Sequence, residues 1–151
     1  MRLQNKNIAT LIAEGVEDLE YYAPLMRLQE EGAQMLSAGL DLKPIKGKNG
    51  LVITPDVTIE TLKANDLFAL VIPGGWAPDF LRRHKEAIDF VKEMDKQKKV
   101  IAAICHAGWV LASAGILKGK NVTCFSAIKD DLINAGAQYS DKEVIVDGNL
   151  I

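Results

Sequence analysis

The sequence predicts an α/β fold, with helices on both faces of one mostly parallel sheet. Short apolar runs rich in β-branched residues are typical of strands buried on both faces of such a sheet. These runs alternate with segments long enough to form the crossover helices that parallel strands require. No repeat, linker or low-complexity segment divides the 151 residues, so a single domain with one hydrophobic core is expected over residues 1–151.

Three apolar runs define the centre of the predicted sheet. They are residues 7–13 (NIATLIA), 67–72 (LFALVI) and 100–104 (VIAAI). A weaker strand is expected at 33–38, and further short strands at 51–54, 57–59, 119–125 and 144–146. The strongest runs lack polar alternation, which places them in the middle of the sheet.

Helices are expected over residues 17–31, 84–98, 107–114 and 128–134, with a turn or short helix at 59–65. The apolar spacing of the first helix assigns its buried face to Leu19, Tyr22, Ala23, Met26 and Leu28. Pro24 lies well inside this helix and is expected to kink or interrupt it. Gly32 is suited to end it, since glycine accepts the left-handed conformation found after many helices.

The strand at 100–104 passes into the helix at 107–114 through Cys105 and His106, with no turn residue before the cysteine. Such a connection forces its first residue into a strained turn that exposes the side chain at the carboxyl edge of the sheet. A helix N-terminus also favours a thiolate, and His106 supplies an adjacent imidazole. The pattern therefore favours a reactive thiol over a buried structural cysteine beside an incidental histidine.

Other residues follow neighbouring strands at the same predicted edge. Gly74 and Gly75 allow backbone N–H groups to approach a substrate, and with the N–H of His106 they form a candidate oxyanion hole. Glu17 could hydrogen-bond the thiol or carry a proton, although an acidic residue in a first helical turn also simply suits the helix dipole. Asp18 and Glu20 are interpreted as solvated helix residues.

Two further side chains are assigned to structure or surface. His84 is interpreted as exposed at the start of a charged helix, and Cys124 as a packing residue on a strand. The two cysteines have neither metal-site nor CxxC spacing, so no metal or other cofactor is expected.

The composition limits the classes of binding partner and the cellular compartment that are expected. A net charge of −2 gives no electrostatic reason to expect nucleic acid or an anionic membrane as a partner. Free thiols indicate a reducing compartment, and no segment shows a signal-peptide pattern or transmembrane length. A cytoplasmic location is therefore expected.

The end of the chain carries a strong hairpin signal. Asp147, Gly148 and Asn149 follow the expected strand at 144–146, and only Leu150 and Ile151 remain after them. The expectation is that the returning strand does not form and that the chain is truncated or partly recorded.

Several motifs in this order and spacing resemble the PfpI family of the ThiJ/PfpI superfamily. They are residues 13–18 leading into RLQEEG at 27–32, VIPGG at 71–75, AICHAGWVLASAG at 103–115, IKDDLINAGA at 128–137 and VIVDGNLI at 144–151. The resemblance covers essentially the whole chain. It implies a flavodoxin-like three-layer sandwich that would continue with a C-terminal strand and helix.

The resemblance also implies roles for individual residues. Cys105 is the nucleophile, His106 its immediate partner, and Glu17 the glutamate that hydrogen-bonds the cysteine. In hexameric members an adjoining subunit supplies a carboxylate, and the matching position here is Asp79, where archaeal members carry Glu. At Ala107-Gly108 this chain departs from the commoner Gly-Pro. A homo-oligomer, either dimer or hexamer, is the implied assembly.

The implied activity is that of a stress-protective, cysteine-dependent hydrolase or lyase of glyoxalase III or deglycase type. Its substrates would be small reactive carbonyls or glycated protein adducts. An intracellular cysteine peptidase is the first alternative, and a redox sensor or chaperone that uses an oxidisable Cys105 is the second. A class I glutaminase is excluded because no histidine follows His106. A purely structural role leaves the Cys105–His106 pair unexplained.

Overall fold

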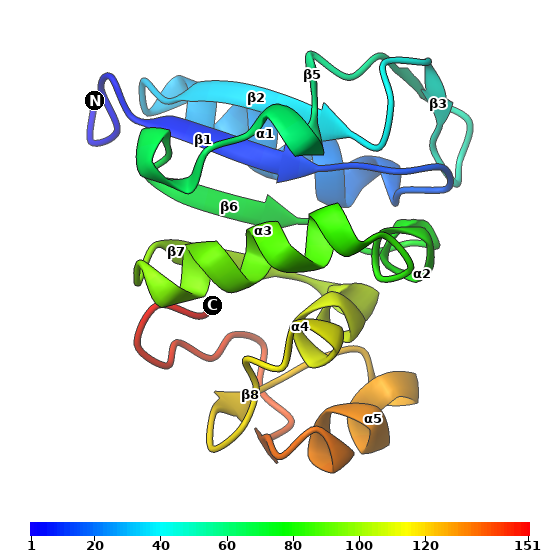
Figure 1. Cartoon of the computed structure of the whole chain (residues 1–151), viewed down its shortest axis with the longest axis vertical. Helices are drawn as coiled ribbons and strands as arrows, with labels where there is room; N and C mark the ends of the chain where they lie inside the picture. The colour runs from blue at the N-terminus through cyan, green and yellow to red at the C-terminus, as the bar shows by residue number, and fades with distance from the viewer.

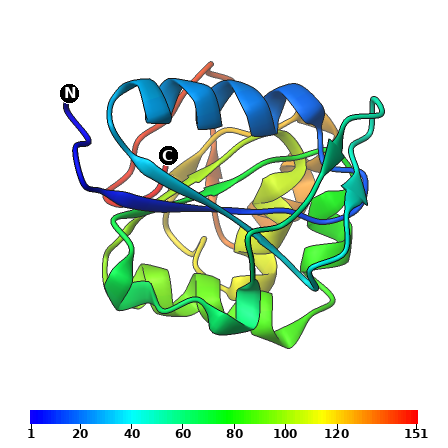
Figure 2. The same ribbon diagram turned by 90° about the horizontal axis from the view of Figure 1, so that it is seen from above.

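The computed structural model describes residues 1–151 and contains a five-stranded parallel sheet with the order β5-β2-β1-β6-β7 (Figure 1). Its strands are β1 (Asn7–Leu11), β2 (Gln34–Gly39), β5 (Val57–Thr58), β6 (Ala69–Ile72) and β7 (Val100–Ala103). Helices α1 (Asp18–Glu30) and α3 (Lys85–Lys96) lie on opposite faces of this sheet (Figure 2). The three-layer sandwich predicted from the sequence is therefore confirmed.

Smaller elements complete the chain. They are the antiparallel pair β3 (Ile45–Lys46) and β4 (Val52–Ile53), the parallel pair β8 (Asn121–Val122) and β9 (Gln138–Tyr139), and the helices α2 (Ala77–Leu81), α4 (Gly108–Ala114) and α5 (Lys129–Asn134). The strand predicted at 119–125 is thus reduced to β8, while β3, β9 and α2 were not predicted. Elements this short carry too few residues for a hydrophobic period to mark them.

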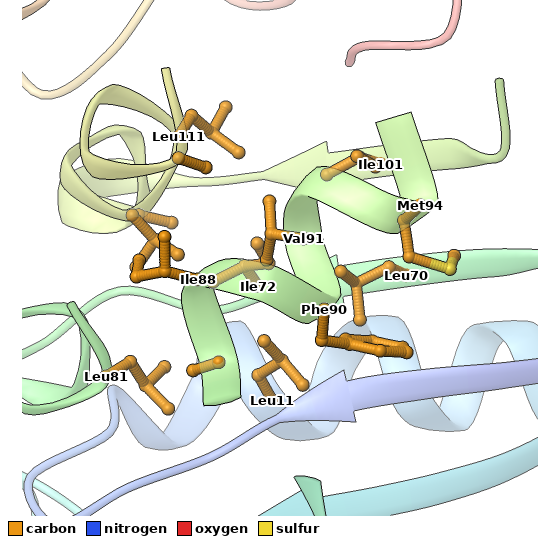
Figure 3. Packing of buried hydrophobic residues seen from close by; sticks show 14 of the residues in the cluster. Leu11, Leu70, Ile72, Leu81, Ile88, Phe90, Val91, Met94, Ile101 and Leu111 are labelled. Atoms are coloured by element: carbon orange, nitrogen blue, oxygen red, sulfur yellow. The ribbon is translucent and has the colours of Figure 1, made fainter. Parts of the chain in front are cut away.

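The core lies between α3 and the sheet. On the helix its buried apolar side chains are Ile88, Phe90, Val91 and Met94, and on the strands they include Leu11, Leu70, Ile72 and Ile101 (Figure 3). Each fully buried side chain of this size contributes roughly 1.5–3 kcal/mol relative to exposure. This packing fixes the carboxyl ends of β6 and β7, from which the candidate site is built.

Helix α1 is rotated relative to the prediction. Leu19 and Met26 are 72% and 58% exposed, whereas Asp18 and Tyr21 are buried. The predicted buried face is therefore only partly correct: Tyr22 and Leu28 pack against the core, whereas Leu19, Ala23 and Met26 are exposed. The helix also continues through Pro24, which removes one backbone hydrogen bond without ending the helix, and Gly32 follows its end with φ +92° as expected.

The strand predicted at 144–146 is also wrong, because Val144 and Val146 are exposed and belong to no strand. The turn predicted at residues 147–149 is present, with the N–H of Leu150 donating to Asp147 O at 3.1 Å. The returning residues then pair beside β7, where the N–H of Ile151 donates to Ile101 O at 2.9 Å. Leu150 forms only isolated bridges to Ile101 and Asp147, and no strand follows β9, as expected for the returning residues.

None of the helices combines the length and the apolar character needed to cross a lipid bilayer.

Candidate active site

Cys105 occupies the predicted elbow. Ile104 follows β7, and Cys105 then begins a single 3-10 turn that leads directly into α4. The backbone of Cys105 has φ +61°, a left-handed conformation that costs a non-glycine residue energy and is held by the surrounding structure. The strain predicted from the strand–Cys–His–helix pattern is present.

His106 lies beside the thiol. Cys105 Sγ and His106 Nδ1 are 3.2 Å apart, within hydrogen-bond distance, and both residues are half-buried. At this distance a proton can pass between sulfur and imidazole without movement of the chain.

A carboxylate reaches the thiol from α1, and it belongs to Glu20. Its Oε2 accepts a hydrogen bond from the N–H of Gly74 at 2.7 Å, and its charge helps to raise the pKa of the Cys105 thiol. Gly74 is closely surrounded, because an added Cβ would lie 2.6 Å from Glu20 Oε2 and 2.7 Å from Cys105 Cβ. Only glycine at this position lets the carboxylate and the thiol approach each other. The interpretation of Glu20 as solvated is wrong.

Glu17 points elsewhere. Its Oε1 accepts a hydrogen bond from Asn49 Nδ2 at 2.7 Å, and its Oε2 lies 3.5 Å from Lys48 Nζ. The physical reason is that Glu17 precedes α1 and has extended backbone angles of φ −70° and ψ 117°. The structure therefore gives Glu20 the position beside Cys105 that was expected for Glu17.

Asp18 is also not solvated, being only 3% exposed. It accepts 2.8 Å hydrogen bonds from the N–H groups of Asn49 and Leu51, in the loop that joins β3 to β4. Burial by itself would raise the pKa of Asp18, but these N–H donors outweigh it and hold the pKa below its ordinary value of 3.8. Asp18 thus ties the first turn of α1 to the β3–β4 hairpin.

The backbone donors differ from the expected set. The N–H of Gly74 is taken by Glu20, whereas the N–H groups of Gly75 and His106 act on the Cys105 thiol by lowering its pKa. Gly75 has φ +75°, and a Cβ there would lie 2.4 Å from Gly15 O, so the close approach of this loop also requires glycine. The N–H groups of Gly75 and His106 therefore both favour the thiolate of Cys105, against the effect of burial.

The environment of Cys105 raises the pKa of its thiol. Burial is the main cause and the Glu20 charge adds to it, while the N–H groups of Gly75 and His106 act in the opposite direction. Burial and the carboxylate thus act against the thiolate that the helix N-terminus is expected to favour. We call Cys105, His106, Gly74, Gly75 and Glu20 the thiol site.

Aromatic side chains that the sequence analysis did not assign enclose His106. The Phe125 ring is stacked on the imidazole with centroids 4.9 Å apart, and the Trp109 ring meets it edge-on at 5.2 Å. The N–H of Phe125 also donates to Cys105 O at 3.3 Å. The only signal in the sequence was that Trp109 lies three residues after His106 on a helix, which places the two side chains on one face.

The remaining assigned residues lie outside the thiol site. Cys124 is partly buried against the core, and burial, followed by the charge of Asp131, raises its pKa. Asp79 is exposed on α2 and paired with Arg83, and His84 is exposed at the start of α3. No three His, Cys, Asp or Glu side chains are grouped as metal ligands would be.

A cavity of about 410 Å³ lies behind the elbow, and 14 of its 20 lining residues are apolar. Its walls come from α1, β7, α4, β8 and residues 143–151. Cys105 borders it, but Glu20, Gly75 and His106 do not. The groups around the reactive sulfur therefore do not face this cavity.

A parallel α/β sandwich with a strained cysteine at the carboxyl edge of its sheet defines a class of candidate cysteine enzymes. The sequence model of the DJ-1/PfpI family matches residues 6–151, and the chain belongs to this family. The family predicted from the sequence is thereby confirmed.

Particular relatives agree over nearly the whole chain. The deglycase PfpI of Pyrococcus furiosus is 40% identical over 95% of this chain and 87% of its own length. The putative cysteine protease YraA of Bacillus subtilis is 40% identical over 97% of this chain and 88% of its own length. A two-domain protein of Anabaena variabilis, with a DJ-1/ThiJ/PfpI-like and a ferritin-like domain, superposes with a TM-score of 0.95 at 41% identity. That structure matches 97% of this chain, which spans 42% of the longer one.

Proposed function

We propose that this protein is a cysteine-dependent hydrolase or lyase that acts on reactive carbonyl compounds or their protein adducts, as a glyoxalase III or deglycase. The observation that carries the proposal is the 3.2 Å contact between Cys105 Sγ and His106 Nδ1, with the Glu20 carboxylate on the adjacent Gly74 N–H. The deglycase name of the Pyrococcus relative supports the same substrate class.

The first chemical step uses the Cys105–His106 pair. Because burial keeps the thiol protonated, the thiol passes its proton to His106 Nδ1 as the sulfur attacks the aldehyde carbon of a substrate such as methylglyoxal. A carbon–sulfur bond forms, the carbonyl π electrons move to oxygen, and that oxygen takes a proton to give a hemithioacetal. Of the N–H groups predicted for the oxyanion hole, that of Gly74 already donates to Glu20, which leaves those of Gly75 and His106 to stabilise the developing negative charge.

The second step belongs to Glu20. Its carboxylate removes the proton from the former aldehyde carbon to give an enediolate and returns it to the neighbouring carbon. The hydroxyl proton on the first carbon passes to the oxygen of the second, so the hemithioacetal becomes a thioester of lactate. Water then cleaves the carbon–sulfur bond and restores the thiol. The sum is methylglyoxal plus water giving lactate, so no oxidant, reductant or glutathione is required.

A peptidase is the second candidate, favoured by the name of the Bacillus relative. A peptide substrate needs a cleft that opens onto the sulfur. The one large cavity that Cys105 borders is not lined by Glu20, Gly75 or His106, so a peptide held there would contact the nucleophile without the groups proposed to assist it. This arrangement suits a small carbonyl better than an extended peptide.

The proposal also includes a homo-oligomeric assembly and a cytoplasmic location. A homo-oligomer would bring Asp79 of an adjoining subunit to the site, and its exposed position on α2 leaves it accessible for such a contact. Size-exclusion chromatography with light scattering tests this, since a monomer at micromolar concentration would contradict it. Both cysteines are free, which fits the reducing cytoplasm.

The test of the function is methylglyoxal consumption with lactate as the readout, in the absence of glutathione. The wild type is expected to produce lactate, Cys105→Ala to produce none above buffer, and Cys124→Ala to match the wild type. Failure of the folded, reduced wild type to produce lactate would overturn the glyoxalase activity. Release of the sugar carbonyl from a glycated peptide then tests the deglycase activity separately.

A further inference from the structure

The imidazole of His106 is held mainly by aromatic rings. Its single side-chain hydrogen bond is the one to Cys105 Sγ. Phe125 stacks on one side with an interplanar angle of 29°, and Trp109 meets the ring edge-on at 69°. An imidazole with one hydrogen bond depends on such neighbours to keep Nδ1 directed at the sulfur.

Trp109 is fixed in turn by polar groups remote from the thiol. Its Nε1–H donates to Asp131 Oδ2 at 2.8 Å, which joins α4 to α5. The Arg82 guanidinium lies 5.4 Å from the centre of the indole, and Arg82 Nε donates to Ser113 Oγ at 3.0 Å. The orientation of the indole is therefore defined by the Asp131 carboxylate, which accepts its N–H, and by the Arg82 cation near its ring.

Phe125 stacks on the imidazole and is 50% exposed. Its backbone N–H donates to Cys105 O, so the residue that carries the stacked ring is attached to the elbow itself. The two aromatic neighbours of His106 thus differ: Phe125 is bonded to the elbow, whereas Trp109 is bonded to Asp131 on a separate helix.

We infer that Trp109, anchored by Asp131, is a positioning residue that holds the His106 imidazole against Phe125 with Nδ1 on the Cys105 thiol. The placement follows from the contacts alone, and its effect on turnover rests on the proposed function. Proton transfer is sensitive to displacements of this size, since a misplacement of about 1 Å is enough to cost a large part of the rate. Loss of the Asp131 acceptor frees the indole and, through it, the imidazole.

The experiment compares Asp131→Ala with Asp131→Asn and with the matched control Asp130→Ala. Asp130 neighbours Asp131 on α5 and is exposed. The chain has two histidines, so nitrogen NMR of the imidazoles reports His106 with His84 as an internal reference. The rate of Cys105 alkylation by iodoacetamide and the separate values of kcat and KM for methylglyoxal complete the readouts.

Asp131→Ala is expected to shift the His106 ring signals while those of His84 stay in place. Cys105 alkylation and kcat are expected to fall about threefold to tenfold with KM unchanged, the effect of losing one hydrogen bond from a positioned group. Asp131→Asn keeps an oxygen acceptor and should stay within about twofold of the wild type, and Asp130→Ala should not differ from it. Trp109→Phe, which removes the N–H donor, should resemble Asp131→Ala and serves if that variant does not fold.

Two results would overturn the inference. One is a folded Asp131→Ala variant whose His106 signals and Cys105 alkylation match the wild type. The other is a lower melting temperature as the only change, which would make the Trp109–Asp131 bond a structural link between helices. If the NMR and alkylation effects appear but the wild type consumes no carbonyl, the positioning role stands and the proposed function fails.

Discussion

The acidic side chains at the start of α1 lie in two regions with different chemistry. In the thiol site, Glu20 meets a strained cysteine whose pKa its charge helps to raise. In the hairpin contact, which consists of Glu17, Asp18 and residues 47–51, the carboxylates accept hydrogen bonds from Asn49 and Leu51. Acidic side chains within four residues thus divide into one that faces a reactive group and two that hold structure. The position of each residue along the backbone at the helix start, rather than its type, decides whether its carboxylate faces the thiol or the hairpin.

The largest effect expected within the thiol site is that of its nucleophile. Cys105→Ala should lower carbonyl turnover at least about a thousandfold, because no other group can form the covalent intermediate. Lactate production under saturating methylglyoxal measures it. Cys124→Ala is the matched control and should retain activity, since Cys124 packs against the core. Equal losses from both would show that packing damage, not chemistry, is being measured.

The contrast between the regions is sharpest for Glu20 and Glu17. Glu20→Gln should reduce kcat about a hundredfold, as expected for a lost proton carrier, while Glu17→Gln should change it less than about threefold. Steady-state kinetics with correctly folded variants, checked by circular dichroism, decide the point. A larger loss for Glu17→Gln than for Glu20→Gln would reverse the assignment.

Gly74 tests whether the close approach within the thiol site matters. The Cβ in Gly74→Ala would lie 2.6 Å from Glu20 Oε2 and 2.7 Å from Cys105 Cβ, so the carboxylate or the elbow must move. Turnover is expected to fall about tenfold or more. Gly119→Ala has nothing within 4 Å of the added Cβ and should keep turnover while losing a little stability to its positive φ. Equal kcat for the wild type and Gly74→Ala would disprove the crowding argument.

Substitutions in the hairpin contact should lower the free energy of unfolding and change the activity very little. Because the folded-state pKa of Asp18 is lowered, its stabilisation is present above 3.8 and is lost as the pH falls through the folded-state value. Asp18→Asn should therefore lower the free energy of unfolding on the order of 2 kcal/mol at neutral pH, with a smaller difference in acid. Urea denaturation at several pH values measures this. A difference that is independent of pH would mean that the Asp18 charge plays no part.

Much of this arrangement could be predicted from the sequence, because it depends on local pattern. The apolar runs at 67–72 and 100–104 contain the buried strand β6 and the strand β7, of which only Ile101 is fully buried. The absence of a turn residue before Cys105 correctly indicated the elbow. Reactive residues that directly follow a strand can be located from the sequence, since the carboxyl ends of parallel strands lie at one edge of the sheet.

The predictions failed where more than one apolar face was possible for a helix, or where the deciding contact joins residues far apart in the sequence. Leu19 and Met26 suggested a buried face, but Asp18 lies inward because N–H donors about thirty residues away stabilise it. Glu17 precedes the helix and reaches the same hairpin, so Glu20 takes the place beside Cys105. The Trp109–Asp131 bond joins residues 22 apart on separate helices, a contact that no local period encodes.

The most direct test of the central claim is site-resolved alkylation of the two cysteines with and without methylglyoxal. Peptide mass spectrometry after a short iodoacetamide pulse reports Cys105 and Cys124 in the same sample. If the carbonyl adds to the thiol site, methylglyoxal should slow the labelling of Cys105 and leave that of Cys124 unchanged. Unchanged labelling of Cys105, or equal protection of both cysteines, would contradict Cys105 as the nucleophile for reactive carbonyls.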